Sequence, residues 1–329
     1  MEYFIEYLLF LSKFMSVVLV LAIAIIATAI IVMRTKTSQD GHIEVKNINQ
    51  KFEEMGLLMK SQVLNKKEFK ESIKLLKSKH KEREKNSSKK DDASKNIFLL
   101  NFKGDIKASE VESLREEITS ILTVAKVSDE VVLILESAGG TVHGYGLAAS
   151  QLKRIRDKKI SLTVAVDKVA ASGGYMMACV ANKIIAAPFA IIGSVGVLAQ
   201  LPNFNRLMKK HGIDYEQLTA GDYKRTLTLF GENSDEDRNK FQEELEDTHK
   251  LFKEFIKDNR NQIDIEKIAT GEHWYGKRAL ELKLVDELMT SDDYLYTASA
   301  NTDIYQISKL RKKPISEKLF STGMKLFGY

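Results

Sequence analysis

The chain has 329 residues, of which 44% are hydrophobic and 29% are charged, and its 50 Lys and Arg residues exceed the 45 Asp and Glu residues by five. This composition excludes a disordered or fibrous protein and leaves room for one large domain or two ordinary ones. The single cysteine, Cys179, excludes an intramolecular disulfide framework and a cysteine-based zinc site.

A long apolar run lies near the N-terminus. Residues 14–33 contain no charged side chain, and a basic residue brackets them on each side. Twenty helical residues span about 30 Å, the thickness of the hydrocarbon core of a bilayer. A cleaved signal peptide would have a shorter apolar run and a small-residue cleavage site, and here Glu2 and Glu6 precede the run. We therefore expect an uncleaved transmembrane helix at 14–33 after an N-terminal flank at 1–13.

A basic segment follows the apolar run. Residues 34–95 carry 17 Lys and Arg against 10 Asp and Glu, a net charge of +7, whereas residues 1–33 and 96–329 each have a net charge of −1. Two interpretations fit this juxtamembrane charge, a solvated helix and attraction to anionic lipid headgroups, while the sparse aromatic residues argue against nucleic-acid binding. Apolar residues at 4-3-4 spacing predict short paired helices in this linker: Ile48, Phe52, Met55, Met59, Phe69, Ile73 and Leu76.

The body of the chain begins after the linker-like composition of residues 86–95 and alternates strand and helix patterns. Apolar runs predict strands, and helical periodicity predicts helices between them; in chain order these are a strand at 96–102, a helix at 108–125, a strand at 130–136, a helix at 143–156 and a strand at 160–166. A β-α-β-α-β order predicts an α/β fold with a parallel sheet.

Two later segments complete the pattern. Residues 185–201 lack charge, but Pro188, Gly193 and Gly196 interrupt them, so we expect buried strands and turns rather than a second membrane span. Ser234, followed three residues later by Asp237, predicts the capped start of a long charged helix.

Three short segments hold the candidate catalytic and ligand-binding residues. Glu136–Gly140 and Ala171–Tyr175 each place a glycine pair directly after a predicted strand, and Ala220–Arg225 is a polar turn that carries Lys224. Such glycines let backbone N–H groups approach a ligand, although they also serve ordinary turns. Ser172 is either a helix cap or a nucleophile with the Gly173 N–H beside it.

A serine nucleophile needs a base, and histidine offers few candidates here. None of the six histidines lies between residues 144 and 210, which leaves His143 as the one near the first glycine pair, where it also suits a helix start. A lysine serves instead when it is neutral near pH 7, which burial beside the serine favours.

The order of motifs resembles the signal peptide peptidase A family of membrane-anchored serine peptidases. The resemblance covers nearly the whole chain, and the motifs are specific together rather than singly. They are ESAGGTVHGYG (136–146), ASGGYMMACVANKIIAAP (171–188), IGSVGV (192–197), GDYKRTLTLFGENSDEDR (221–238) and GKRALELKLVDEL (276–288).

This resemblance implies a crotonase-like, Clp-protease-like fold and a serine endopeptidase without metal or cofactor. It implies Ser172 as nucleophile, Lys224 as general base and Ser194 as the serine that orients the lysine. The oxyanion hole would use backbone N–H groups of Gly139 or Gly140 and of Gly173. A non-catalytic membrane scaffold and a crotonase-type acyl-CoA enzyme are the two alternatives, and neither needs the pair Ser172 and Lys224.

The resemblance also implies partners and a location. Members with a single peptidase domain form ring-like homo-oligomers and cleave membrane-derived peptides, including spent signal peptides. We expect the peptidase domain at 96–290 and a basic C-terminal tail at 291–329. The family places the peptidase domain on the periplasmic face of the bacterial inner membrane, whereas the basic residues after the anchor favour the cytoplasmic face, and we adopt the periplasmic one.

Overall fold

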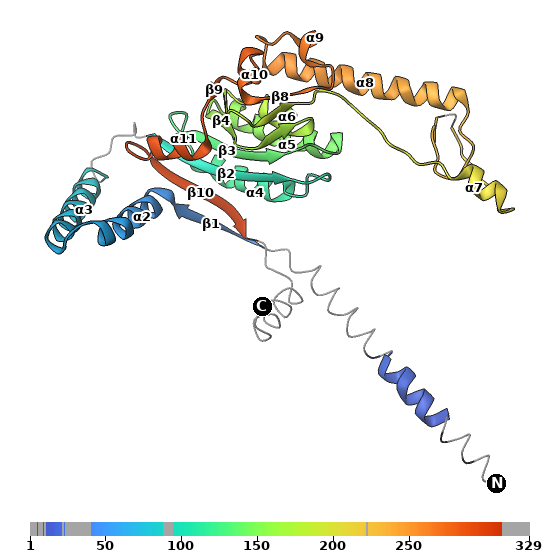
Figure 1. Ribbon diagram of the computed structural model, residues 1–329, viewed down its shortest axis with the longest axis horizontal. Coiled ribbons are helices and arrows are strands. Elements are labelled where there is room, and N and C mark those ends of the chain that lie inside the picture. The colour runs from blue at the N-terminus through green and yellow to red at the C-terminus, as the bar shows by residue number, and fades with distance from the viewer. Residues whose placement is uncertain are drawn as a thin grey trace. The chain divides into compact units, whose positions relative to one another are not determined.

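The computed structural model (Figure 1) describes residues 5, 9, 11–21, 23, 41–87, 95–221 and 223–310. Most of the predicted anchor at 14–33 lies outside these residues and stays a prediction. None of the helices in the described ranges combines the length and apolarity needed to cross a bilayer. The chain divides into two units, 1–44 with 309–329, and 45–308, and the candidate site belongs to the second.

The fold is built on a largely parallel sheet. Its main path runs β1-β10-β2-β3-β4-β6-β9, and every pairing given from β10 to β9 is parallel. The strands of this path are β1 (His42–Asn47), β2 (Asn96–Gly104), β3 (Glu130–Ser137), β4 (Ser161–Val166), β6 (Lys183–Ala186), β9 (Glu287–Leu288) and β10 (Asp303–Leu310). Strands β3 and β4 are almost fully buried and β2 is buried at Ile97–Leu100 and Phe102, as expected of parallel strands covered on both faces.

A short branch leaves this path at the carboxyl end of β3. There Ser137 pairs with Ala170 of β5 (Val169–Ala171), whereas Glu130–Ile134 of β3 pair with β4. Strand β5 pairs with β7 (Ile191–Gly193), which pairs antiparallel with β8 (His273–Tyr275). The end of β3 therefore lies where two strand rows meet, a position that favours a ligand site in α/β sheets.

Helices cover both faces of the sheet. Helices α4 (Val111–Leu122), α5 (Val142–Asp157) and α6 (Gly173–Ala178) pack side by side, and Tyr145 of α5 meets Phe102 of β2 with ring centroids 6.4 Å apart. Ile97 and Leu99 of β2 point to the opposite face, because side chains alternate along a strand. There they form a cluster with Ile48 of α2 (Ile48–Val63) and Leu295 of α11 (Ser291–Ala298).

Four of the five remaining helices described within residues 45–308 belong to the second half of the sequence. They are α3 (Lys66–Ser87), α7 (Asn205–Lys210), α8 (Asp235–Asn259), α9 (Ile265–Ile268) and α10 (Gly276–Glu281). The predicted capping box at the start of α8 is present, since the Ser234 and Asp237 side chains bond to each other's backbone N–H groups. At its other end, buried Arg260 makes two hydrogen bonds to Asp286, of 2.8 and 2.9 Å, which tie α8 to the sheet.

The predicted α/β alternation is confirmed, and the mixed fold fits the Clp-protease-like architecture. Two predicted boundaries differ from the structure. The linker at 34–95 contains strand β1 as well as the two predicted helices, which are α2 and α3 and contact each other, while Ile48 and Phe52 pack on the sheet. The expected tail at 291–329 begins with α11 and β10, and β10 pairs with β2, so the sheet extends beyond residue 290.

A buried carboxylate joins three elements at the amino ends of the strands. Glu130 of β3 accepts hydrogen bonds from Thr163 of β4 at 2.5 Å and Tyr294 of α11 at 2.6 Å, and pairs with Lys95 at 2.7 Å. Burial alone would raise the pKa of Glu130, but the hydrogen bonds from Lys95, Thr163 and Tyr294 outweigh it and hold the pKa below the ordinary value of 4.5. The ionised form is therefore the one that stabilises the fold.

The variant Glu130→Gln tests this contribution. A group whose pKa is depressed by folding stabilises the fold above its unfolded-state pKa and loses that effect as the pH falls through the folded-state pKa. We expect the variant to lose about 1–3 kcal/mol of unfolding free energy at pH 7, with the difference shrinking below about pH 4.5. Urea unfolding from pH 3.5 to 7 measures this, with Glu112→Gln at the exposed Arg115 pair as control. A difference that is constant with pH would contradict the assignment.

Candidate active site

Ser172 lies at the junction of β5 and α6 in an unusual backbone conformation. Its φ of 51° and ψ of −119° are strained for a residue with a side chain, and such strain concentrates at functional sites. The backbone N–H of Ser172 donates to the Gly193 carbonyl at 2.7 Å, which fixes the turn against the end of β7. Its hydroxyl makes no capping hydrogen bond to α6, so Ser172 does not cap this helix through its side chain.

The turn after β3 presses against this serine. Gly139 has a φ of 90°, and a β-carbon placed on it would lie 2.8 Å from the Gly173 nitrogen and from the Ser172 β-carbon. A β-carbon on Gly140 would overlap the Ile106 backbone carbonyl. Both positions therefore require glycine, and this requirement explains the pair that stood out in the sequence.

The backbone N–H groups near Ser172 differ in their partners. The Gly139 N–H donates to the Ser137 hydroxyl oxygen at 3.0 Å. In the part of the chain that the structure describes, the N–H groups of Gly140 and Gly173 have no hydrogen-bond acceptor. Both glycines line the same cavity as Ser172, and N–H donors without an acceptor beside a serine are what an oxyanion hole needs.

Ser194 follows the end of β7, next to the same site. It also has a positive φ, 53°, and its N–H donates to the Glu272 carbonyl at 2.7 Å. The Trp274 ring packs against the preceding Gly193, where a β-carbon would lie 2.8 Å from it. The β7–β8 pairing therefore holds Ser194 in place.

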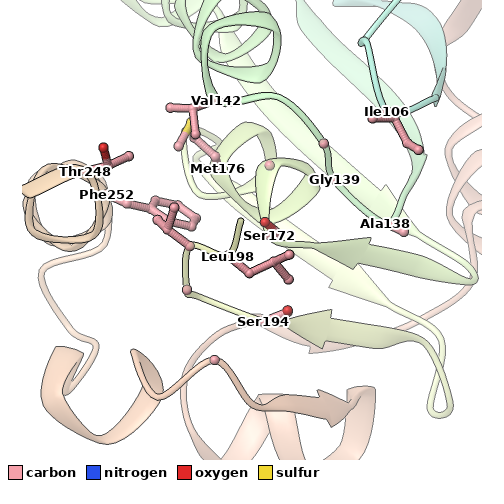
Figure 2. A pocket seen from close by; sticks show the side chains of 15 residues that line it. Ile106, Ala138, Gly139, Val142, Ser172, Met176, Ser194, Leu198, Thr248 and Phe252 are labelled. Atoms are coloured by element: carbon pink, nitrogen blue, oxygen red, sulfur yellow. The ribbon is translucent and has the colours of Figure 1, made fainter. Parts of the chain in front are cut away.

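These turns open into one cavity of about 460 Å³ (Figure 2). Ser172 and Ser194 both line it, as do the glycines at positions 139, 140 and 173. Thr248 and Phe252 reach it from α8 (Figure 2). Its walls are mainly apolar and are formed by Ile106, Val142, Met176, Val197, Leu198 and Phe252. The cavity thus combines two serine side chains with mainly apolar walls, as ligand sites commonly do.

Lys224 does not line this cavity. Its side chain is exposed, and it lies in a turn whose backbone is held by a hydrogen bond from its own N–H to the Gly221 carbonyl at 3.2 Å. The ring of the neighbouring Tyr223 lies under the Lys240 ammonium of α8, 4.9 Å from the ring centroid. Within one chain, the structure therefore brings five of the six predicted site residues together and leaves the lysine outside.

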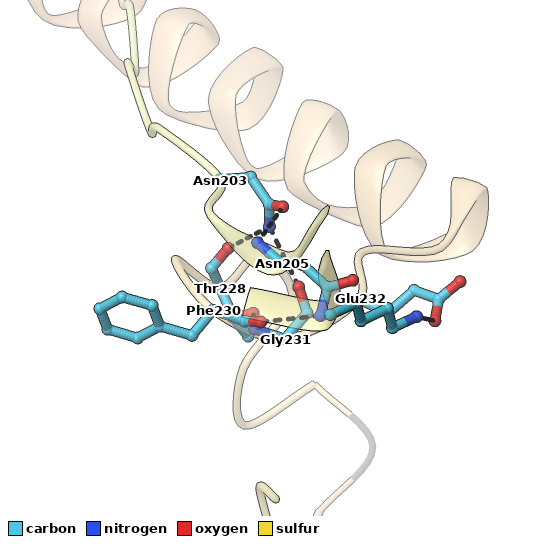
Figure 3. Close-up of polar contacts among 7 residues, drawn as sticks. Asn203, Asn205, Thr228, Phe230, Gly231 and Glu232 are labelled. Carbon is cyan, nitrogen blue, oxygen red and sulfur yellow. Dashed lines mark hydrogen bonds and ion pairs between the residues drawn. The ribbon is translucent and has the colours of Figure 1, made fainter. Parts of the chain in front are cut away.

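The segment that carries Lys224 is closed by polar contacts at its base, and we call residues 203–233 the clasped lobe. The Asn203 side-chain amide donates to the Thr228 and Gly231 carbonyls at 2.9 and 3.0 Å (Figure 3). Asn205 donates in the same way to the Phe230 carbonyl at 2.8 Å. These side-chain amides add to the backbone hydrogen bond from the Phe204 N–H to the Leu229 carbonyl at 2.7 Å, and together they hold the two ends of the segment.

The clasped lobe exposes much apolar surface. Leu207, Ile213 and Tyr223 are each more than half exposed, and Leu218 is 95% exposed. Leu198, at the rim of the cavity just before the lobe, is 78% exposed. Several large apolar side chains of the clasped lobe are therefore exposed to solvent in the single chain.

Sequence reasoning missed the cavity walls. Thr248 and Phe252 come from a charged helix some 80 residues after Ser172, and no motif in α8 links them to the serine.

Comparison with known proteins covers almost the whole chain. The family model described as "Peptidase family S49 N-terminal" matches residues 2–152, and "Peptidase family S49" matches residues 154–304. The chain is 48% identical over 309 residues to "Probable protease SohB" of Haemophilus influenzae, covering 92% of this chain and 88% of that protein. The protein of the same name in Buchnera aphidicola subsp. Schlechtendalia chinensis is 48% identical over 303 residues, with 90% and 99% covered.

Replacement of Gly140 tests the close approach of the two turns. Gly140→Ala places a methyl group against the Ile106 backbone, and we expect it to cost roughly 1–3 kcal/mol and to slow labelling of Ser172 by a fluorophosphonate at least about tenfold. Gly146→Ala is the matched control, because a β-carbon there meets nothing within 4 Å and α5 gains about 1 kcal/mol. Thermal unfolding and labelling rates measure both effects, and equal behaviour of the two variants would refute the geometry.

Proposed function

The chain belongs to peptidase family S49 as a SohB-like protease, and we propose that within this family it is a serine endopeptidase that works through Ser172 and Lys224. The observation that supports this most is Ser172 itself. It has a strained backbone and lines a mainly apolar cavity together with Gly140 and Gly173, whose N–H groups have no acceptor in the described part of the chain. A helix cap or a packing serine needs neither feature.

In the proposed mechanism, the Ser172 oxygen attacks the carbonyl carbon of a peptide bond while a neutral lysine takes its proton. The N–H groups of Gly140 and Gly173 stabilise the oxyanion of the tetrahedral intermediate. The lysine then gives the proton to the leaving amine, and water releases the acyl-enzyme. Of the two glycines expected at the first turn, Gly140 fits this role, because the Gly139 N–H already donates to Ser137.

We propose that the lysine comes from a neighbouring copy of the chain. A lysine base must be buried beside the serine to be neutral, and Lys224 is exposed in its own chain. The exposed apolar side chains of the clasped lobe suit burial against a second copy, which agrees with the ring-like assembly that the family resemblance implies. Ser194, beside Ser172 in the cavity, would then orient the incoming ammonium group.

The apolar walls favour apolar substrate side chains next to the cleaved bond. No charged residue lines the described cavity, and its volume of about 460 Å³ accepts side chains of the size of leucine. Signal peptides and other membrane-derived peptides have this character. We propose these as substrates, with the enzyme anchored in the bacterial inner membrane through residues 14–33 and its lipid contact supported by the basic segment 34–95.

Mixing two inactive variants tests the shared dyad. Ser172→Ala and Lys224→Ala should each reduce cleavage of an apolar fluorogenic peptide by more than about a thousandfold. If serine and lysine come from different copies, rings co-assembled from equal amounts of the two variants recover about a quarter of wild-type activity, because a quarter of the interfaces hold both intact groups.

The outcomes of this mixing experiment are distinct. No recovery would place both residues in one chain, and full activity of either single variant would refute the dyad itself. A mixture of wild type with the double variant controls for simple dilution of intact rings.

Topology is tested separately with the full chain. A periplasm-dependent reporter, such as alkaline phosphatase, fused after residue 95 should be active, and the same fusion should leave a cytoplasm-dependent reporter inactive. The opposite pattern would place the peptidase domain in the cytoplasm.

A further inference from the structure

A buried chain of hydrogen bonds runs beneath the candidate site. The Tyr145 hydroxyl of α5 donates to the Asp105 backbone carbonyl at 2.7 Å and lies 2.5 Å from the Ser137 hydroxyl. The Ser137 oxygen in turn accepts the Gly139 N–H at 3.0 Å. Tyr145 is completely buried, and Ser137 is 2% exposed, so no solvent competes for these groups.

The donors and acceptors fix the direction of this chain. A tyrosine hydroxyl has one hydrogen, and the Asp105 carbonyl can only accept, so Tyr145 donates its hydrogen to that carbonyl. The Ser137 hydroxyl must then donate to the Tyr145 oxygen and accept from Gly139. Burial raises the pKa of Tyr145, which keeps its hydroxyl protonated as this chain requires. Each of the two hydroxyls thus donates one hydrogen bond and accepts one, and the Gly139 N–H has the Ser137 oxygen as its acceptor.

The ring of Tyr145 supports the other side of the site. A β-carbon on Gly173 would overlap the Tyr145 ring, so the backbone of Gly173 rests directly on that ring. Gly104 of β2 gives the hydroxyl its space, because a β-carbon there would overlap the Tyr145 oxygen and lie 2.6 Å from the Ser137 oxygen. One side chain thus contacts Gly173 through its ring and, through Ser137, holds the turn that contains Gly140.

We propose that Tyr145 is a positioning residue that, together with Ser137, sets the spacing and direction of the two oxyanion donors, the N–H groups of Gly140 and Gly173. This inference rests on the proposed serine peptidase function. Tyr145 is too deeply buried to touch a substrate, so it acts through the backbone and is not a catalytic residue. Neither end of the chain of hydrogen bonds reaches the Ser172 hydroxyl.

The variant Tyr145→Phe isolates the hydroxyl, because it keeps the ring under Gly173. We expect kcat for an apolar fluorogenic peptide to fall roughly 10- to 100-fold, because a donor shifted by less than 1 Å stabilises the oxyanion poorly. KM should change by less than about twofold, because ground-state binding does not use these donors. Inhibition by a peptide aldehyde, which forms a tetrahedral adduct with the serine, should weaken by a factor similar to the loss in kcat.

Tyr175→Phe is the matched control. Tyr175 is also completely buried and also donates to a backbone carbonyl, that of Leu284, at 3.0 Å. Removing the Tyr175 hydroxyl should have a similar structural cost, but this hydroxyl makes no hydrogen bond to either glycine turn. We expect similar melting temperatures for the two variants and near wild-type kcat for Tyr175→Phe alone.

A second variant keeps the test informative if Tyr145→Phe folds poorly. Ser137→Ala removes the link between the tyrosine and Gly139, and it should lower kcat as Tyr145→Phe does, with little further loss in the double variant because both act on one turn. Equal kcat for Tyr145→Phe and Tyr175→Phe, or parallel changes in kcat and KM, would overturn the positioning role while Ser172 remains the nucleophile. A wild-type protein whose Ser172 reacts with neither substrate nor fluorophosphonate would instead overturn the proposed function, and the positioning role with it.

Discussion

The site depends on the close approach of two backbone turns, the one after β3 and the one after β5. Gly139 lies so near Ser172 and Gly173 that a single β-carbon at either glycine would meet the opposing turn or the ring beneath it. Glycine at 139, 140 and 173 is therefore a steric requirement rather than a preference for flexibility. The same contact explains the branching of the sheet, because the pairing of Ser137 with Ala170 brings both strand ends to one place. The left-handed backbone of Ser172 is tolerated because a hydrogen bond to Gly193 fixes it from a third turn.

Much of this architecture could be predicted from sequence, because buried parallel strands are continuous apolar runs. Strands β2, β3 and β4 have that signature, and the intervening helices have a clear apolar face. The elements that were misjudged have weaker signals. Strand β10 is only partly buried and mixes polar with apolar residues, so its place beside β2 depends on a tertiary contact some 200 residues away. Ile48 and Phe52 were seen as apolar, but nothing in their spacing tells whether a sheet or a second helix covers them.

The candidate site could likewise be predicted from the sequence only in part. The glycine-pair motifs pointed to Ser172 and to the two turns beside it, because a requirement for small residues can be read directly from the amino-acid sequence. Whether Lys224 reaches the serine of its own chain is not visible there, since spacing along the sequence carries no information about assembly. The polar clasp at Asn203 and Asn205 shows how the lobe can present its lysine without a packed core of its own. The cavity walls from α8 were equally hidden, because Phe252 looks like any apolar residue on an amphipathic helix.

The single cysteine can report local opening of the structure around α6. Cys179 follows α6 and is completely buried, its thiol lies 3.2 Å from the Met176 carbonyl, and burial raises its pKa well above the ordinary value. Because the thiolate is the reactive form, an alkylating reagent can modify Cys179 only after the layer around α6 has separated. The alkylation rate therefore reports the free energy of opening at the very segment that holds Ser172, and with one thiol in the chain no second signal overlaps it.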